Sequence, residues 1–324
     1  SVRLITERSR VQISPGPPLS HNLAVILHFD RYYFNNIFIR RLYYIHSNVK
    51  ELFMKVFAQT FTLDPQTPIE TISLAHRQGF QGVEITCEYP RGPLEYTRET
   101  ILQVKRLAQK YNMPLLVHAP YHNVMLADIN PRIHEASVQS IKDGIDFAGQ
   151  IGARIVTIHL GSTTKSRLKH FCEIVRKALL NSIITIIDYA EKYNLTIALE
   201  NVQSDVHSFW EEAFGKRAEE IIDILREIDA KNIGVTFDVG HANTVGDPVD
   251  FAIKLASYIV NVHMHDNDGT KDQHLVIGEG KIDFRRILRI LKENGYDGPL
   301  VLEYFDPLSL MRARMKLSGI LEGL

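Results

Sequence analysis

The stretch RIVTIH at residues 154–159 is a short, β-rich apolar run that ends in a histidine. It lies between two longer amphipathic runs, at residues 131–151 and 167–193, and Gly152 marks the end of the first. Strands that alternate with helices are typical of βαβ units, which build parallel sheets. Such a sheet is covered on both faces, which explains why the strand is almost entirely apolar.

The same strand–helix unit repeats along the chain from Met54 onward. We expect strands at residues 55–61, 82–86, 114–118, 154–159, 195–200, 233–238, 258–265 and 299–303. Helical patterns between them include residues 67–78, 95–111, 131–151, 167–193, 216–228 and 284–294. Eight such units predict an α/β fold, a single closed TIM-type (β/α)8 barrel over residues 54–324.

An open, doubly wound sheet is the competing fold. That fold needs a glycine-rich, phosphate-binding turn after its first strand. The first predicted strand runs instead into TLDPQ at residues 62–66, which contains no glycine. We therefore favour the barrel.

Residues 1–53 do not share the repeating pattern. SPGPP at 14–18 breaks regular structure. RYYF at 31–34 and RRLYY at 40–44 are aromatic and basic without a helix or strand period. We interpret the segment as a non-barrel N-terminal extension, either poorly ordered or not part of the natural product. An arm that contacts a partner or nucleic acid is the functional alternative, and a targeting peptide is disfavoured because no apolar core with a cleavage site follows.

The composition is that of a globular protein with no charge bias. Hydrophobic residues make up 45% of the 324 residues, and 37 basic against 38 acidic residues give a net charge of −1. This balance offers no electrostatic footprint for nucleic acid or a membrane. No uncharged apolar stretch reaches the ~18 residues of a membrane span. With only Cys87 and Cys172, we expect no disulfide scaffold and a cytoplasmic location.

Polar side chains stand at or just beyond the C-terminal ends of seven predicted strands. They are Glu84, His118, His159, Glu200 with Asn201, Asp238 with His241, His263 with His265, and Glu303, and the loop after strand seven adds Asp272 and His274. In a barrel these ends meet at one mouth, where active sites lie. So many ionisable groups in one ring are costly unless something compensates their charge. A divalent metal does so, and nitrogen and oxygen donors without cysteine suit Zn, Mn, Co or Mg.

Each of these residues has a plainer interpretation when taken alone. A single strand-end His or Glu is usually salt-bridged or solvated, and Glu84 or His263 by itself indicates no more than that. His263 and His265 point to the same side of their strand, so only depth distinguishes them. The remaining histidines and Asp272 are either ligands or groups that support the ligands and bind substrate.

Five motifs resemble those of the xylose-isomerase-like TIM barrels, a superfamily that holds sugar isomerases and epimerases and also endonuclease IV, the abasic-site DNA repair nuclease. The resemblance covers residues 54–324. The motifs are HAPY at 118–121, ALEN at 198–201, DVGH at 238–241, HDND at 265–268 and HLVIGEG at 274–280.

The isomerase and epimerase branch implies one metal ion and a small sugar or sugar-phosphate substrate. The implied ligands are Glu200, Asp238, His265 and Glu303. Such enzymes move a proton next to a carbonyl, while the metal stabilises the developing enediolate. Glu200 and Glu303 would be the acid–base pair. We assign substrate binding to Tyr121, Glu84, Asn201, His263 and Arg91, whose guanidinium suits a phosphate.

The endonuclease IV branch implies three zinc ions, nine ligands and a DNA substrate. The matching positions are His118, His159, Glu200, Asp238, His241, His265, Asp272, His274 and Glu303. Several zinc ions suit phosphodiester hydrolysis, because they generate hydroxide and stabilise both attacking and leaving oxygens.

Three departures from endonuclease IV favour the isomerase or epimerase. HNV at 122–124 follows the tyrosine where the nuclease has Leu-Ile-Asn, and DVGH at 238–241 replaces its Asp-Thr-Cys-His. Only six residues separate His265 from Asp272, where the nuclease has a long loop. Those loops help the nuclease hold DNA. We therefore predict a metal-dependent sugar isomerase or epimerase, with the zinc endonuclease as the alternative.

Overall fold

The computed structural model describes residues 54–60, 68–204 and 211–324. The predictions for the extension at 1–53 and for the turn at 62–66 lie outside the described residues. Both cysteines are described, and Cys87 and Cys172 are free thiols. Within the described part of the chain, no helix is long and apolar enough to cross a membrane.

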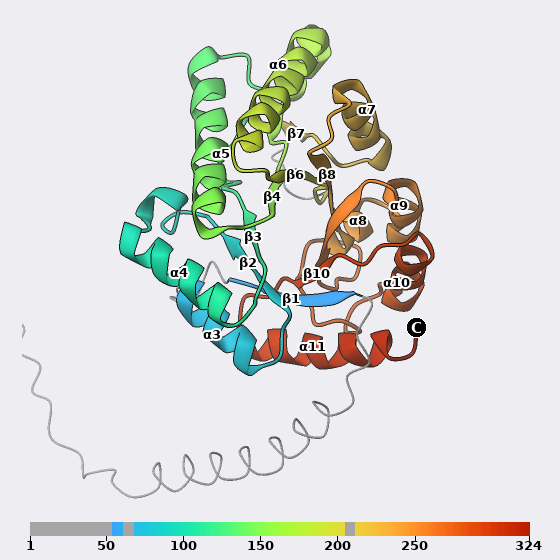
Figure 1. Cartoon of the computed structure of the whole chain (residues 1–324). Helices are drawn as coiled ribbons and strands as arrows, with labels where there is room; N and C mark the ends of the chain where they lie inside the picture. Colours follow the sequence, from blue (N-terminus) through green and yellow to red (C-terminus); the bar gives the residue numbers. More distant parts are fainter. Residues whose placement is uncertain (1–53, 61–67, 205–210) are drawn as a thin grey trace, which may run out of the picture. The chain divides into compact units, whose positions relative to one another are not determined.

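Eight parallel strands close into a barrel, which confirms the predicted fold (Figure 1). The strands are β1 (Lys55–Gln59), β2 (Gly82–Thr86), β3 (Leu115–His118), β4 (Ile155–Ile158), β6 (Thr196–Glu200), β8 (Ile233–Asp238), β9 (Ile259–Met264) and β10 (Pro299–Leu302). They follow one another around the barrel in sequence order, and β10 pairs with β1 to close it. Every carboxyl end therefore lies at the same mouth.

Helices surround the barrel and return the chain between strands (Figure 1). They are α3 (Pro68–Arg77), α4 (Arg98–Lys110), α5 (Pro131–Ile151), α6 (Lys165–Glu191), α7 (Ala218–Ile228), α8 (Val239–Val245), α9 (Pro248–Leu255), α10 (Phe284–Glu293) and α11 (Pro307–Leu321). Helix α5 shows how the sequence sets such bounds. Asn130 caps its first turn and Pro131 starts it, while Gly152 ends it with a positive φ of 80°.

Two features at the mouth were not among the predicted elements. Helix α8 begins directly at the end of β8, because the Asp238 side chain accepts a hydrogen bond from the backbone N–H of His241. The loops after β4 and β6 also pair as a small antiparallel sheet, made of β5 (Ser162–Thr164) and β7 (Glu211–Ala213). Both features add structure on the side of the barrel where the predicted ligands lie.

The apolar core has two parts. The larger part packs the outer faces of the strands against the helices. The smaller part lies inside the barrel and consists of Phe57, Leu116 and Val301, with Ile155 packed against it. Gly82 makes room for it, since a Cβ at that position would lie 2.2 Å from the Phe57 ring. Side chains alternate along a strand, so two residues beyond Phe57 and Val301 the same inward face carries Gln59 and Glu303.

Candidate metal centre

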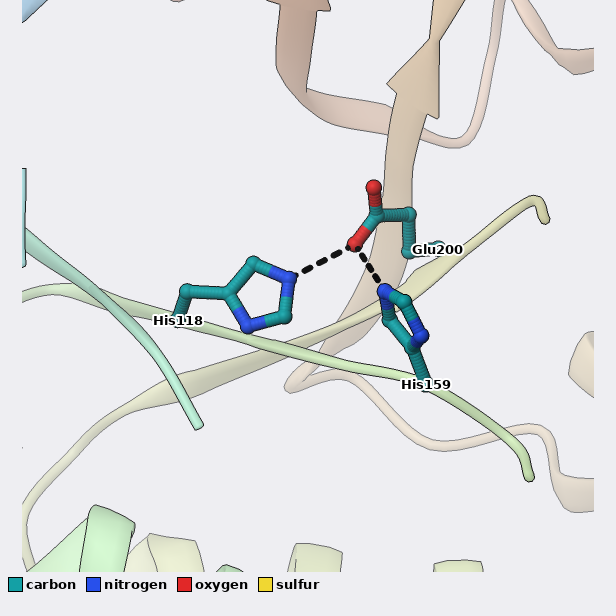
Figure 2. A group of neighbouring side chains, drawn as sticks. All are labelled: His118, His159 and Glu200. Atoms are coloured by element: carbon teal, nitrogen blue, oxygen red, sulfur yellow. Dashed lines mark hydrogen bonds and ion pairs between the residues drawn. The ribbon is translucent and has the colours of Figure 1, made fainter. Parts of the chain in front are cut away.

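The ends of β3, β4 and β6 bring together the first group of predicted ligands (Figure 2). Glu200 ends β6, and its Oε2 accepts hydrogen bonds from His118 Nε2 and His159 Nε2, both at 3.0 Å. His118 also donates from Nδ1 to the carbonyl oxygen of Ala119 at 2.8 Å. Burial would lower the pKa of His118, but the hydrogen bond to Glu200 outweighs it and raises that pKa.

The ends of β8 and β9 form a second group. His265 Nε2 lies 3.1 Å from Asp238 Oδ1 and 3.2 Å from Oδ2. His241, in the first turn of α8, lies 3.7 Å from Asp238 Oδ2 through Nδ1, which also donates to the carbonyl oxygen of Asn201. The Asn201 side chain bonds both backbone groups of Asp238, so it fixes the junction between β8 and α8.

A third group lies between β9 and β10. His274 donates from Nε2 to Asp272 Oδ2 at 3.1 Å and from Nδ1 to the carbonyl oxygen of Glu303 at 3.0 Å. Its ring stacks on that of His265, with centroids 3.9 Å apart. The Glu303 carboxylate lies 3.9 Å from His265 Nε2, and Asp272 reaches His241 Nε2 at 3.5 Å.

The donors fit a divalent metal. Five groups of three side chains have ligand atoms within 4.8 Å of one another. The groups overlap, because five residues each belong to two of them: Glu200, Asp238, His263, His265 and Glu303. His265 Nδ1 is buried with no hydrogen-bond partner. Eight of the nine predicted ligands belong to these groups, and Asp272 joins them through His241 and His274. The nine therefore form one cluster of nitrogen and oxygen donors, a chemistry that Zn, Mn, Co and Mg accept.

Imidazoles and carboxylates set one another's protonation. Burial would raise the pKa of Glu200, but His263, His159 and His118 outweigh it and hold that pKa well below its usual range. Burial likewise opposes charge on His274, yet Asp272 raises the pKa of His274 to about 9. His159 differs, because burial outweighs Glu200 and lowers its pKa. The imidazoles and carboxylates of the cluster therefore compensate one another's charge.

Two residues predicted to bind substrate lie beneath the ligands. Glu84 and His263 are fully buried. His263 Nε2 lies 3.0 Å from Glu84 Oε1, and His263 Nδ1 lies 3.1 Å from Glu200 Oε1. Burial would raise the pKa of Glu84, but His263 outweighs it and lowers that pKa. The two side chains lie below the cluster inside the barrel, and their polar atoms contact other protein groups.

Of the other three substrate-binding candidates, Asn201 has both side-chain polar atoms bonded to the Asp238 backbone, and Tyr121 and Arg91 lie at the mouth. The Tyr121 ring lies 5.1 Å, centroid to centroid, from the rings of both His118 and His159. Its backbone N–H donates to Glu88, a buried carboxylate that also accepts from the N–H of His122. Arg91 lies in the loop between β2 and α4, and its backbone N–H donates to the carbonyl oxygen of Glu88. Glu88 therefore ties these two loops together.

Sequence reasoning missed several polar residues inside the barrel. Gln59 ends β1 and donates from Nε2 to Glu303 Oε1 at 2.5 Å. Asn261 donates to Glu84 Oε2 at 2.9 Å, and Thr157 and Thr236 share a hydrogen bond at 2.8 Å. The sequence pattern predicts a first strand that runs to residue 61, so it does not mark Gln59, where β1 ends, as a strand-end residue.

Gly240 makes room for a ligand. A Cβ at this position would lie 1.9 Å from His265 Cε1. Real Cβ atoms do not approach that closely, so His265 keeps this position only because residue 240 lacks a side chain.

Comparisons with known proteins agree with the barrel. The family model described as xylose isomerase-like TIM barrel matches residues 72–318. The Methanocaldococcus jannaschii protein MJ1311 is 32% identical over 272 residues, which are 83% of this chain and 90% of that protein. Fructoselysine 3-epimerase of Shigella flexneri is 26% identical over 71% of this chain and 82% of its own. The crystal structure of a D-tagatose 3-epimerase-like protein has a TM-score of 0.74 at 30% identity, covering 83% of this chain and 97% of that one.

Proposed function

Because the chain belongs to the xylose isomerase-like TIM barrel family, we propose that it is a metal-dependent epimerase or isomerase of a sugar or sugar phosphate. The observation that carries the proposal is the placement of two glutamates. Glu200 Oε1, at the end of β6, and Glu303 Oε1, just after β10, lie 3.1 and 3.6 Å from the same nitrogen, His263 Nδ1. Relatives that are sugar 3-epimerases support the reaction class.

Four side chains would hold the cation. Glu200, Asp238, His265 and Glu303 come from four different strand ends, and their contacts run from one to the next through the cluster. A bound divalent cation supplies an electrophile that polarises the carbonyl and hydroxyl oxygens of a substrate. His118, His159, His241 and His274 would then surround the substrate oxygens as hydrogen-bonding groups.

The two glutamates would move the proton. Glu200 is a carboxylate at neutral pH, because the surrounding imidazoles hold its pKa low. It is therefore ionised and free to accept a proton from the carbon next to a carbonyl, as a general base must be. The Glu303 carboxylate lies 3.6 Å from His263 Nδ1. It would return a proton to the other face of that carbon. Replacement from the opposite face inverts the centre, and transfer to the neighbouring carbon isomerises the sugar.

The experiment that tests this function is a solvent-exchange assay. The purified chain is incubated in D₂O with Mn²⁺, Co²⁺ or Mg²⁺ and a panel of ketoses and ketose phosphates, and the products are followed by NMR. We expect deuterium next to the carbonyl of at least one substrate, together with an epimer or isomer. A full panel with no deuterium incorporation under any metal would overturn the proposal.

One observation favours a second candidate, a zinc-dependent endonuclease that cleaves DNA at abasic sites. Eight of the nine positions that match endonuclease IV ligands belong to groups of three that could hold a metal ion, and the ninth, Asp272, contacts two of them. Gly240 argues against it, since this position matches a cysteine in the nuclease motif, and any side chain here would collide with the His265 ring. Cleavage of abasic-site DNA by the zinc-loaded chain would support this candidate over the epimerase.

A further inference from the structure

Gln59 contacts one of the two glutamates from below. Its Nε2 donates to Glu303 Oε1 at 2.5 Å and lies 3.4 Å from Glu84 Oε1. Gln59 comes from β1, which like β2 supplies none of the nine predicted ligands, and its side chain is buried. A neutral amide therefore stands between two buried carboxylates and offers hydrogen-bond donors toward both.

The contact belongs to a chain that joins the two glutamates underneath the mouth. From Gln59 the chain passes to Glu84, whose Oε1 lies 3.0 Å from His263 Nε2. It then continues through His263 Nδ1 to Glu200 Oε1 at 3.1 Å. Asn261 holds the other Glu84 oxygen at 2.9 Å. Each link is buried, so neither glutamate can move without disturbing its neighbours.

Glu303 depends on Gln59 more than Glu200 depends on any one group. Glu200 receives three close imidazoles, at 3.0, 3.0 and 3.1 Å. Around the Glu303 carboxylate the imidazoles of His263 and His265 stand farther off, at 3.6 and 3.9 Å. Gln59 is thus the nearest hydrogen-bond donor to that carboxylate among the described side-chain contacts.

We propose that Gln59 is a positioning residue, which holds Glu303 Oε1 so that Oε2 faces His265 and the metal cluster. The proposal rests on the proposed function for its catalytic meaning, but its structural claim concerns Glu303 alone. A glutamate at 59 would place three carboxylates side by side, and an apolar residue would leave Glu303 without its nearest donor. Groups that orient metal ligands typically change metal affinity or activity by about 10–100-fold when removed.

The test compares Gln59→Met with a matched control in the full chain. Gln103→Met removes a similar Gln–Glu contact, 2.9 Å long, from the exposed surface of α4. Co²⁺ affinity is measured by competition with a coloured chelator, and Tm, kcat and KM are measured alongside. We expect Gln59→Met to weaken Co²⁺ binding by about tenfold or more and to lower kcat with little change in KM. Gln103→Met should leave all four unchanged.

A double-mutant cycle separates positioning from a general loss of structure. In a Glu303→Gln background, Gln59→Met should weaken Co²⁺ binding little further, because it acts through Glu303. In an Asp272→Asn background it should keep its full effect. If the Met variant does not fold, Gln59→Asn replaces it in the same three backgrounds. Its amide is one methylene too short to reach either carboxylate.

The outcomes distinguish this inference from the proposed function. Co²⁺ affinity of Gln59→Met within about twofold of the wild type, or a full additional loss in the Glu303→Gln background, would overturn the positioning role. A weakened, Glu303-dependent affinity in a chain that turns over no sugar would keep the positioning role and overturn the epimerase.

Discussion

The two ends of the barrel interior differ in chemistry but use the same device. At the amino-terminal end, Gly82 lacks a side chain, and the Phe57 ring fills the space against Leu116 and Val301. At the carboxyl end, Gly240 lacks a side chain, and the space holds the His265 ring. One glycine admits a ring that closes the core, and the other admits a ring that belongs to the cluster of nitrogen and oxygen donors.

The difference shows how one barrel meets two demands. The apolar end stabilises the fold, since burying each large side chain contributes about 1.5–3 kcal/mol. The polar end buries carboxylates and imidazoles, which is favourable only because they compensate one another. Changes at the apolar end should therefore affect stability, and changes at the polar end should affect metal binding and turnover.

The largest effect should come from the two glutamates. Glu200→Gln and Glu303→Gln keep the shape of the side chain but remove the group that accepts the proton. Each should lower kcat by about 10²–10⁴-fold, the usual contribution of general acid–base catalysis. Sugar turnover checks this, with the exposed Glu99→Gln as a control. Near-full activity of Glu303→Gln would exclude the acid–base pair.

The next largest effect should come from adding one methyl group at the polar end, by Gly240→Ala. Gly240→Ala places a Cβ where the His265 ring lies, so the ring must leave its position. We expect metal affinity to fall by about 10–100-fold, as for other changes that displace a ligand. A titration with Co²⁺ measures it. An unchanged affinity would show that His265 does not bind the metal from this position.

The same change at the apolar end should act on stability alone. Gly82→Ala places a Cβ 2.2 Å from the Phe57 ring, and overpacking of this kind costs about 1–3 kcal/mol. Urea unfolding of the metal-free protein measures the loss, and Co²⁺ affinity should stay near the wild-type value. If Gly82→Ala weakens metal binding as much as Gly240→Ala does, the two ends are not independent.

The last prediction concerns pH, and its effect is the smallest when it is counted over a single pH unit. Asp272 raises the pKa of His274 to about 9 against the opposing effect of burial, so this imidazole is protonated at neutral pH. If metal binding draws on His274, the proton must leave, and affinity should rise by about tenfold per pH unit up to pH 9. The His274–Asp272 pair stabilises the metal-free fold fully below pH 6.5 and loses that contribution as pH rises through about 9. Metal affinity and metal-free stability should therefore change in opposite directions, as titrations between pH 6 and 10 would show.

The sequence predicted the barrel and the meeting of the strand ends, for a clear reason. Apolar runs and the glycine after α5 report local structure, and in a closed barrel the residue after each strand must point to one mouth. His118, His159 and Glu200 are found this way. The sequence could not predict how deep each histidine of β9 lies in the barrel. His263 and His265 point to the same side, and only their contacts show that His263 lies beneath.

Contacts between distant strands were also out of reach. Gln59 and Glu303 are 244 residues apart, and nothing local to either marks the pair. The space left by Gly240 is equally invisible until β9 is placed beside α8. Periodicity reports what one segment does, whereas these features depend on how the barrel closes.

The most direct test of the central claim is the metal content of the full chain, measured by elemental mass spectrometry after mild buffer exchange. A sugar epimerase with Glu200, Asp238, His265 and Glu303 as ligands predicts about one divalent ion per chain. About three zinc ions per chain would contradict it and favour the DNA endonuclease.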